Sequence, residues 1–397
     1  MNETILIIDD SYFMITLLET ILKDNGYNTL TAKDGATGLE QVQSSFPDLI
    51  LLDIIMPNLD GYEVCQKLQA NDDTRDIPII FLSAKTEAED KVKGLQLGGS
   101  DYITKPFDKG EVLARVQTHL KIKRLTRDLI NTNSVLRENQ ARLEEDLNAA
   151  SAIQRSLLPQ TAETNPRLDI SWQFRPSEKI GGDIFNLIPI KEDFLEFYIL
   201  DVSGHGVPAA LIAVSVSQAL QPHSNLVIKA KSRSSNTTQE INSPDNVLKY
   251  LDEEFPIERF DKFFTIFYGV LDFRKGLLSY SNAGHPPAYL IKSNGELLNL
   301  EKGGPIIGLQ DILPFDMEKI ELDTGDKLLL YTDGVTEYEN TQHKMYGEKR
   351  LLETLHQARE KPCAHLVKDL YNDLLNFGNG AAPKDDISLL AFEFKGP

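Results

Sequence analysis

Short apolar runs alternate with amphipathic helical stretches along the first part of the chain. The runs occupy residues 5–8, 28–31, 49–52, 79–82 and 102–104. Strands that alternate with helices in this way are typical of a parallel sheet covered by helices. We therefore predict an α/β domain with a parallel five-stranded sheet over residues 1–120.

Residues 121–158 follow a different pattern, with dense charge and no glycine or proline, which predicts one long helix. Leucine or alanine recurs at the heptad spacing of one coiled-coil seam, at Leu129, Leu136, Leu143, Ala150 and Leu157. The second seam, which runs from Leu125 to Ile153, is interrupted by polar residues, namely Thr132, Asn139 and Asp146. We predict a coiled-coil linker that makes the chain a homodimer, with a solvated single helix as the alternative.

Residues 159–397 contain short strands with alternating polarity, such as 196–200, 264–271 and 327–331. Two packed sheets with helices outside them, an α/β sandwich, fit this pattern. A length of 397 residues also exceeds what one ordinary hydrophobic core holds. The chain is thus predicted to contain two globular domains joined by a helical linker.

Charge and composition narrow the set of partners. The formal net charge is −19, so nucleic acid is repelled and is not an expected partner. No apolar run approaches the ~20 residues of a membrane helix, and the first residues lack the features of a signal peptide. We expect a cytoplasmic protein without membrane contact. Cys65 and Cys363 have no zinc-type spacing and are expected to be reduced thiols.

Polar side chains follow the predicted strands of the first domain, at the edge where a parallel sheet binds its ligands. They are Asp9, Asp10, Asp53, Ser83 and Lys105. One such aspartate alone is more often a helix cap, but three together require a cation, and Mg²⁺ prefers oxygen ligands. Asp53 can then act as a nucleophile and form an aspartyl phosphate, while Lys105 and Ser83 contact the phosphoryl oxygens.

These residues resemble the receiver domain of bacterial response regulators over residues 1–120. The matching motifs are Ile7-Ile8-Asp9-Asp10, Leu52-Asp53-Ile54-Ile55-Met56-Pro57, Asp60-Gly61-Tyr62, Leu82-Ser83-Ala84 and Lys105-Pro106-Phe107. The resemblance implies a flavodoxin-like fold and phosphorylation of Asp53 by a sensor histidine kinase. It also implies that the carbonyl of Ile55 is a further Mg²⁺ ligand and that Lys105–Pro106 is a cis bond. Tyr102 falls on the family's aromatic switch position, and a half-buried strand aromatic is the alternative.

Acidic motifs mark the last domain: Gly181-Gly182-Asp183, Asp201-Val202-Ser203-Gly204-His205-Gly206, Thr332-Asp333-Gly334 and Lys384-Asp385-Asp386. Aspartates at the start of turns can hold a pair of hard divalent cations, which activate a water and neutralise a phosphoryl group. Asp201 is the candidate shared ligand of both ions, with the carbonyl of Val202 beside it. Asp183 is the candidate for one ion, and Asp333 and Asp385 are the candidates for the other.

In this order the motifs resemble the SpoIIE-like branch of the metal-dependent Ser/Thr protein phosphatases. Further matching stretches are 152–159, which resembles the family's switch helix, and 267–272, 282–287 and 330–337. The resemblance implies a PPM-type α/β sandwich with two Mn²⁺ or Mg²⁺ ions. It also implies hydrolysis of phosphoserine or phosphothreonine on a regulatory protein, usually an anti-sigma-factor antagonist.

We therefore expect a response regulator whose output is protein phosphatase activity controlled by Asp53. The alternative is a binding module that sequesters a sigma-factor regulator without turnover, and the presence of all the candidate carboxylates favours the enzyme. Two points stay open. His205 either takes part in catalysis or only shapes its turn, and the cation that holds the substrate phosphate is not fixed, with Arg175 and Lys179 as candidates. His285 is expected to be structural and Asp386 to support the ligand Asp385.

Overall fold

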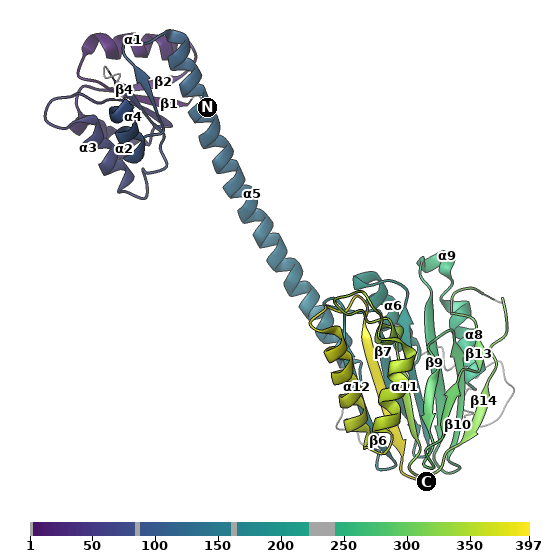
Figure 1. The fold of residues 1–397 in the computed structure, drawn as a ribbon. Coiled ribbons are helices and arrows are strands. Elements are labelled where there is room, and N and C mark those ends of the chain that lie inside the picture. Colours follow the sequence, from purple (N-terminus) through teal and green to yellow (C-terminus); the bar gives the residue numbers. More distant parts are fainter. Residues whose placement is uncertain (1–2, 84–87, 160–164, 222–242, 311) are drawn as a thin grey trace. The chain divides into compact units, whose positions relative to one another are not determined.

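The computed structural model describes residues 3–83, 88–159, 165–221, 243–310 and 312–397. The chain divides into two compact units, Met1–Ala141 and Arg142–Pro397, which are considered separately below. Figure 1 shows the elements of both units. Within the described residues, no helix is long and apolar enough to cross a membrane.

The first unit is built on a five-stranded parallel sheet with the strand order β2-β1-β3-β4-β5. Its strands are β1 (Thr4–Ile8), β2 (Asn28–Ala32), β3 (Leu49–Asp53), β4 (Ile79–Ser83) and β5 (Asp101–Thr104). The five predicted strands are therefore confirmed to within a residue at each end. Continuous apolar runs predict such strands well because a parallel sheet is buried on both faces.

Helices cover the two faces of this sheet, namely α1 (Tyr12–Lys23), α2 (Gly35–Ser45), α3 (Gly61–Gln69), α4 (Ala88–Gln96) and the start of α5 (Lys109–Ser156). Alternate residues of β3 point to opposite faces. Ile50 packs with Val42 of α2 and Val64 of α3, whereas Leu51 packs with Leu18 of α1 and other residues on that face. Asp9, Asp53 and Ser83 lie at the carboxyl ends of β1, β3 and β4.

Helix α5 is the longest element, with 48 residues. It begins closer to the N-terminus than the sequence pattern predicts, because the last helix of the first unit continues into the linker without a break. Beyond Leu120 its large apolar residues are exposed; Leu129, for example, is 63% exposed and Leu143 is 59% exposed. These residues are therefore available to another helix.

The second unit contains two sheets, as the alternating strands predicted. One has the order β13-β10-β9-β8-β7 with β14 beside β10, and the other has the order β12-β11-β15-β16-β6. The strands are β6 (Leu168–Arg175), β7 (Ile184–Lys191), β8 (Phe194–Val202), β9 (Phe264–Asp272), β10 (Leu277–Ala283), β11 (Ala288–Ile291), β12 (Leu297–Leu300), β13 (Gly303–Gly304), β14 (Glu318–Glu321), β15 (Lys327–Tyr331) and β16 (Ile387–Phe394).

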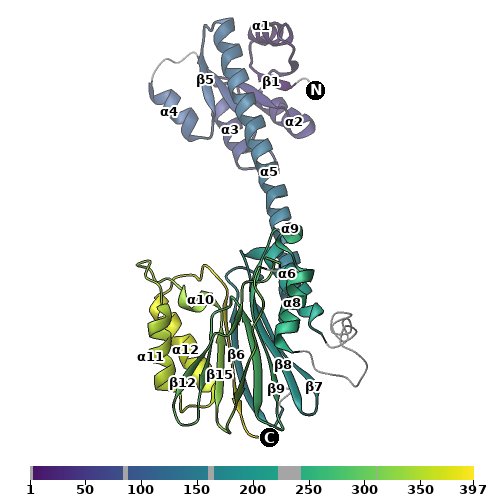
Figure 2. The same cartoon turned by 90° about the vertical axis from the view of Figure 1, so that its right-hand side faces the viewer.

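The sheets pack face to face over an aromatic core. Phe197 of the first sheet meets Phe392 of the second edge-to-face, with ring centroids 5.0 Å apart. Figure 2 shows that helices form the outer layers. They are α6 (Gly206–Ala219) and α8 (Pro244–Glu254) on one side, α11 (Gly347–Ala358) and α12 (Cys363–Gly378) on the other, and the short α9 (Ile257–Phe260) and α10 (Asp333–Thr336) at one end.

Candidate functional site

The first unit places its acidic residues at the carboxyl ends of two neighbouring strands. Asp9 follows β1 and Asp53 ends β3, so their side chains meet, and both are buried. The ligand atoms of Asp9, Asp10 and Asp53 all lie within 4.8 Å of one another. The Nζ atom of Lys105 lies 2.8 Å from Oδ2 of Asp9 and 3.0 Å from Oδ2 of Asp53.

The charges of this cluster do not balance. Burial raises the pKa of Asp53 above its usual value, although the Lys105 ammonium acts in the opposite direction. Three carboxylates against one ammonium leave negative charge uncompensated in a partly buried place. An all-oxygen set of this kind fits a hard divalent cation such as Mg²⁺.

The remaining predicted residues of the first unit surround this cluster or flank it. Ser83 is buried at the end of β4, and Lys105–Pro106 is a cis bond, as expected. Ile55 lies on an exposed turn after β3. Tyr102 is half-buried on β5. Their proposed roles in the receiver-type site stay predictions.

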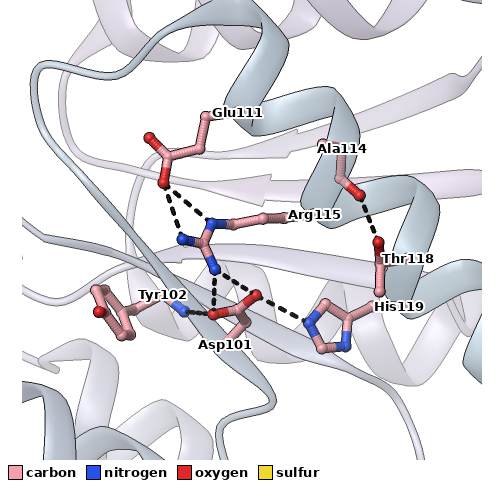
Figure 3. Close-up of polar contacts among 7 residues, drawn as sticks. All are labelled: Asp101, Tyr102, Glu111, Ala114, Arg115, Thr118 and His119. Atoms are coloured by element: carbon pink, nitrogen blue, oxygen red, sulfur yellow. Dashed lines mark hydrogen bonds and ion pairs between the residues drawn. The ribbon is translucent and has the colours of Figure 1, made fainter.

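A network of hydrogen bonds and ion pairs, which no sequence motif indicates, connects β5 to α5 (Figure 3). The guanidinium of Arg115 donates to both carboxylate oxygens of Asp101, at 2.7 and 2.8 Å, and also to Glu111 at 3.1 Å. His119 lies 3.1 Å from the same aspartate. The strand that leads to Lys105 is thereby linked to the helix that leaves this unit.

The second unit gathers its acidic motifs at one end of the sandwich. Asp183 precedes β7, Asp201 lies near the end of β8, Asp333 opens α10 after β15, and Asp385 precedes β16. In each sheet the two strands are antiparallel, so the end of one strand lies beside the start of the other. The four positions therefore lie at the same end of the sandwich. The structure thus brings together the four carboxylates that the sequence singled out.

The pKa values show how strongly these carboxylates repel one another. Burial, followed by the charges of Asp333 and Asp385, raises the pKa of Asp201 to about 8. Burial and the charge of Asp201 raise the pKa of Asp183 well above its usual value. Burial also raises the pKa values of Asp333 and Asp385. All four carboxylates can be ionised together at neutral pH only if positive charge lies beside them.

Hydroxyl groups fix the orientation of Asp183. Its Oδ2 atom accepts hydrogen bonds from Thr332 at 2.7 Å and from Ser388 at 2.6 Å. Thr332 follows β15 and Ser388 lies in β16, both of one sheet, whereas Asp183 precedes β7 of the other sheet. The sequence assigned no role to either hydroxyl, although Thr332 opens the Thr332-Asp333-Gly334 motif and Ser388 lies two residues after Asp386.

Asp386 uses its carboxylate to hold backbone. It accepts hydrogen bonds from the N–H of Gly182 at 2.6 Å and from that of Ser177 at 2.7 Å. A β-carbon at Gly181 would lie 2.1 Å from its Oδ2, and one at Gly334 would lie 1.9 Å from its carbonyl oxygen. The glycines of two motifs are therefore required for this close approach.

The last turn of α5 contacts the same glycine turn. The buried side chain of Gln154 donates to the carbonyl of Gly181 at 2.7 Å and accepts from its N–H at 3.2 Å. No sequence motif indicates this contact, apart from the position of Gln154 in the stretch that resembles a switch helix. The linker helix is thus bonded directly to the backbone beside Asp183.

The histidines and basic residues that the sequence singled out in this unit differ in exposure and in their partners. His205 is exposed, with Nδ1 2.8 Å from Oε1 of Glu178. His285 is buried, and burial lowers its pKa to about 3, so it is neutral. Lys179 forms an ion pair with Glu144 of α5 at 3.1 Å, whereas Arg175 ends β6.

The donor set of the second unit fits hard divalent cations, since it consists of carboxylate and carbonyl oxygens. Among the described residues, its carboxylates are spread more widely than those of the first unit, where three ligand atoms lie within 4.8 Å of one another. A wider set is what two neighbouring ions require.

Two family descriptions match the chain. Residues 5–117 match the response regulator receiver domain, and residues 191–395 match Stage II sporulation protein E (SpoIIE). The second match covers more than half of the 397 residues. The chain belongs to the SpoIIE family.

Individual relatives resemble one unit or part of the chain. The alkaline phosphatase synthesis transcriptional regulatory protein PhoP of Bacillus subtilis (strain 168) is 46% identical over 121 residues, which are 30% of this chain and 50% of that protein. Protein IcfG of Synechocystis sp. is 27% identical over 260 residues, which are 62% of this chain and 41% of that protein. The chain thus spans half or less of the length of these two relatives.

A solved structure supports the fold of the second unit. The SiaA-PP2C domain of Pseudomonas aeruginosa superimposes with a TM-score of 0.54 at 21% sequence identity, covering 64% of this chain and 98% of that domain. At this identity the likeness concerns the fold alone. The predicted PPM-type α/β sandwich, for which PP2C is another name, is therefore confirmed.

The raised pKa of Asp201 predicts a pH-dependent stability of the second unit. Without divalent cations, its free energy of unfolding should fall as the pH rises from the usual aspartate value of 3.8 to about 8. The folded state keeps a proton in this range that the unfolded state has released, so rising pH favours unfolding. Added Mn²⁺ should remove most of this dependence.

Chemical denaturation followed by the fluorescence of Trp172, the single tryptophan of the chain and part of β6, measures this effect. Samples in chelator and in Mn²⁺ are compared across the pH range, with Asp201→Asn as the control that should flatten the chelator profile. Stability in chelator that stays level or increases towards pH 8 would show that the carboxylates are not mutually destabilising.

Proposed function

We propose that this protein is a two-component response regulator whose output is metal-dependent hydrolysis of phosphoserine or phosphothreonine on a regulatory protein. The observation that carries the proposal is the convergence of four buried or half-buried carboxylates at one end of a SpoIIE-family sandwich. A receiver-type unit precedes it on the same chain.

The hydrolytic site assigns a separate task to each group. Asp201 would be the ligand shared by the two ions, and the carbonyl of Val202 would be a further ligand. Asp183 would also hold one ion, and Asp333 and Asp385 would also hold the other. Two Mn²⁺ or Mg²⁺ ions bound there supply an activated water and neutralise the phosphoryl oxygens. The hydroxyls on Asp183 and the backbone contacts of Asp386 keep the carboxylates in place without contacting substrate.

The first unit would carry the input. The Oδ atom of Asp53 attacks the phosphorus of a phosphohistidine, the phosphorus–nitrogen bond breaks, and the imidazole leaves. Lys105 and Ser83 stabilise the charge on the transferred phosphoryl oxygens. The Mg²⁺ ligands would be Asp9, Asp10, Asp53 and the carbonyl of Ile55. A sensor histidine kinase is the partner that this chemistry requires.

The substrate we propose is a phosphorylated anti-sigma-factor antagonist. Membership of the SpoIIE family and the acidic hydrolytic site support a phosphoprotein substrate, and the net charge of −19 makes nucleic acid an unsuitable partner.

We further propose that the protein is a homodimer that pairs through α5. Residues at heptad spacing, Ile122, Leu129, Leu136 and Leu143, are each more than half exposed, and a second copy would bury them. Both ends of α5 are bonded to functional parts, through Asp101 near Lys105 and through Gln154 at Gly181. A change in helix pairing would therefore reach the acidic turn through existing hydrogen bonds.

Replacing Asp201 by alanine should abolish Mn²⁺-dependent release of phosphate from a phosphoserine protein, because the shared ligand of both ions is lost. Asp369→Ala, at a half-buried position of α12 that pairs with Lys361, is the matched control and should retain wild-type turnover. Trp172 fluorescence should show that both variants fold. Wild-type turnover by Asp201→Ala would remove Asp201 from the metal site.

Asp53→Asn should accept no phosphate from a small phosphodonor in the presence of Mg²⁺, whereas the wild type should gain one acid-stable, base-labile phosphate. Asp34→Asn changes the N-cap of α2 in the same unit and should label like the wild type. Intact-mass measurement before and after base treatment reads the result. Equal labelling of Asp53→Asn would exclude Asp53 as the only acceptor.

Replacing the polar seam residues Thr132, Asn139 and Asp146 with leucine should fix one pairing of α5. Phosphate release should then no longer respond to a phosphodonor, at either a high or a low constant rate. The same substitutions at exposed positions off the seam, such as Asn133→Leu, serve as the control. A triple variant that responds like the wild type would indicate a signal that does not pass through helix pairing.

A further inference from the structure

The hydrolytic site has carboxylates for metals, and it also needs a cationic side chain that binds the substrate's phosphate. We propose that Lys262 binds this phosphate, an assignment that rests on the proposed phosphatase function. The dianion of a phosphorylated side chain must approach an acidic pocket, so a fixed cation at its edge lowers the electrostatic cost of binding.

Lys262 lies opposite the turn that follows Asp201 and Val202 at the end of β8. In the antiparallel pair of β8 and β9, Asp201 faces Thr265 and Val202 faces Phe264. The pairing continues beyond the strands, because the N–H of Ser203 donates to the carbonyl of Phe263 at 2.9 Å, and the N–H of Phe263 donates to Oγ of Ser203 at 3.2 Å. The residue before Phe263 is Lys262, two residues ahead of the start of β9.

The ammonium of Lys262 lies over this turn. A β-carbon placed on Gly204 would be 2.7 Å from Nζ of Lys262. Gly204 has a φ of +84°, a conformation that glycine adopts readily, and its turn begins two residues after the proposed shared ligand Asp201. The positive charge is therefore held beside the turn of the metal site.

The backbone that carries Lys262 is held on its other side as well. The N–H of Ile257, at the start of α9, donates to the carbonyl of Gly308 at 3.0 Å. The N–H of Gly308 in turn donates to the buried carboxylate of Asp252 at 2.6 Å. The chain is therefore held at Ile257, five residues before Lys262, and again at Phe263, directly after it.

Lys262 is half-buried and, within the described part of the chain, makes no hydrogen bond or ion pair. Its ammonium lies at the turn that follows Asp201, beside the acidic site. A phosphate oxygen would supply the missing partner through a charge-assisted hydrogen bond.

The other basic candidates fit less well. Lys179 is already paired with Glu144. Arg175 follows Phe174 on β6, and Phe174 packs in the core between the sheets. Because side chains alternate along a strand, Arg175 points to the opposite face, together with its register partner Ile387, which packs under α11 and α12.

The test uses the full chain loaded with Mn²⁺ and inorganic phosphate as the probe, since the product of hydrolysis binds where the phosphoryl group did. Calorimetry gives its Kd, and inhibition of phosphoserine peptide hydrolysis gives its Ki. Lys262→Ala should raise both constants about tenfold or more, as expected for a lost hydrogen bond to a charged group. The KM of the peptide should rise with them, while the affinity for Mn²⁺ stays unchanged.

Three variants separate this role from structural and bulk-charge effects. Lys262→Arg should restore most of the phosphate affinity. Lys319→Ala removes an equal charge from the exposed surface of β14 and should leave both constants at wild-type values, and so should Arg175→Ala. Unchanged phosphate affinity in Lys262→Ala, or its loss in Arg175→Ala alone, would overturn the assignment.

The outcome is distinguishable from failure of the proposed function. Wild-type turnover combined with unchanged phosphate affinity in Lys262→Ala would contradict only the assignment of Lys262. Absence of turnover in the wild type, combined with Mn²⁺-dependent phosphate binding that Lys262→Ala removes, would contradict hydrolysis and support the phosphate site.

Discussion

The second unit depends on one contact, between the carboxylate of Asp386 and the backbone of the Gly181-Gly182-Asp183 turn. The N–H groups of Gly182 and Asp183 donate to this buried carboxylate, which fixes the turn at the end of the sandwich. The turn then presents Asp183 to the hydroxyls of Thr332 and Ser388. Glycine is required where the chains approach, because a β-carbon at Gly181 or Gly334 would overlap Asp386.

Around this contact the fold holds carboxylates that repel one another. Burial and the neighbouring carboxylates raise the pKa of Asp201 to about 8, so ionising all of these groups lowers the stability of the folded state. Such an arrangement persists because two sheets and their hydrogen bonds fix the strand ends, and it becomes favourable when cations enter. The same logic applies to Asp9 and Asp53 in the first unit, where Lys105 provides part of the compensation.

The sequence predicted the strands of the first unit and singled out carboxylates that the fold brings together, because buried parallel strands and acidic turn motifs are local signals. It did not predict contacts between residues far apart in the chain. Arg115 reaches Asp101, Gln154 reaches Gly181, and Lys262 faces Gly204 only once the backbone is folded. The start of α5 was missed for another reason: helix pattern alone does not show where one domain's last helix ends and a linker begins.

We propose that phosphorylation of Asp53 sets the rate of hydrolysis in the second unit. It is tested by measuring phosphate release from a phosphoserine protein by one Mn²⁺-loaded sample, before and after Asp53 is phosphorylated and the phosphodonor is removed. The account predicts a change of roughly 5–150-fold, the range of a typical allosteric coupling. An unchanged rate in a sample shown by mass to carry the phosphate on Asp53 would contradict it.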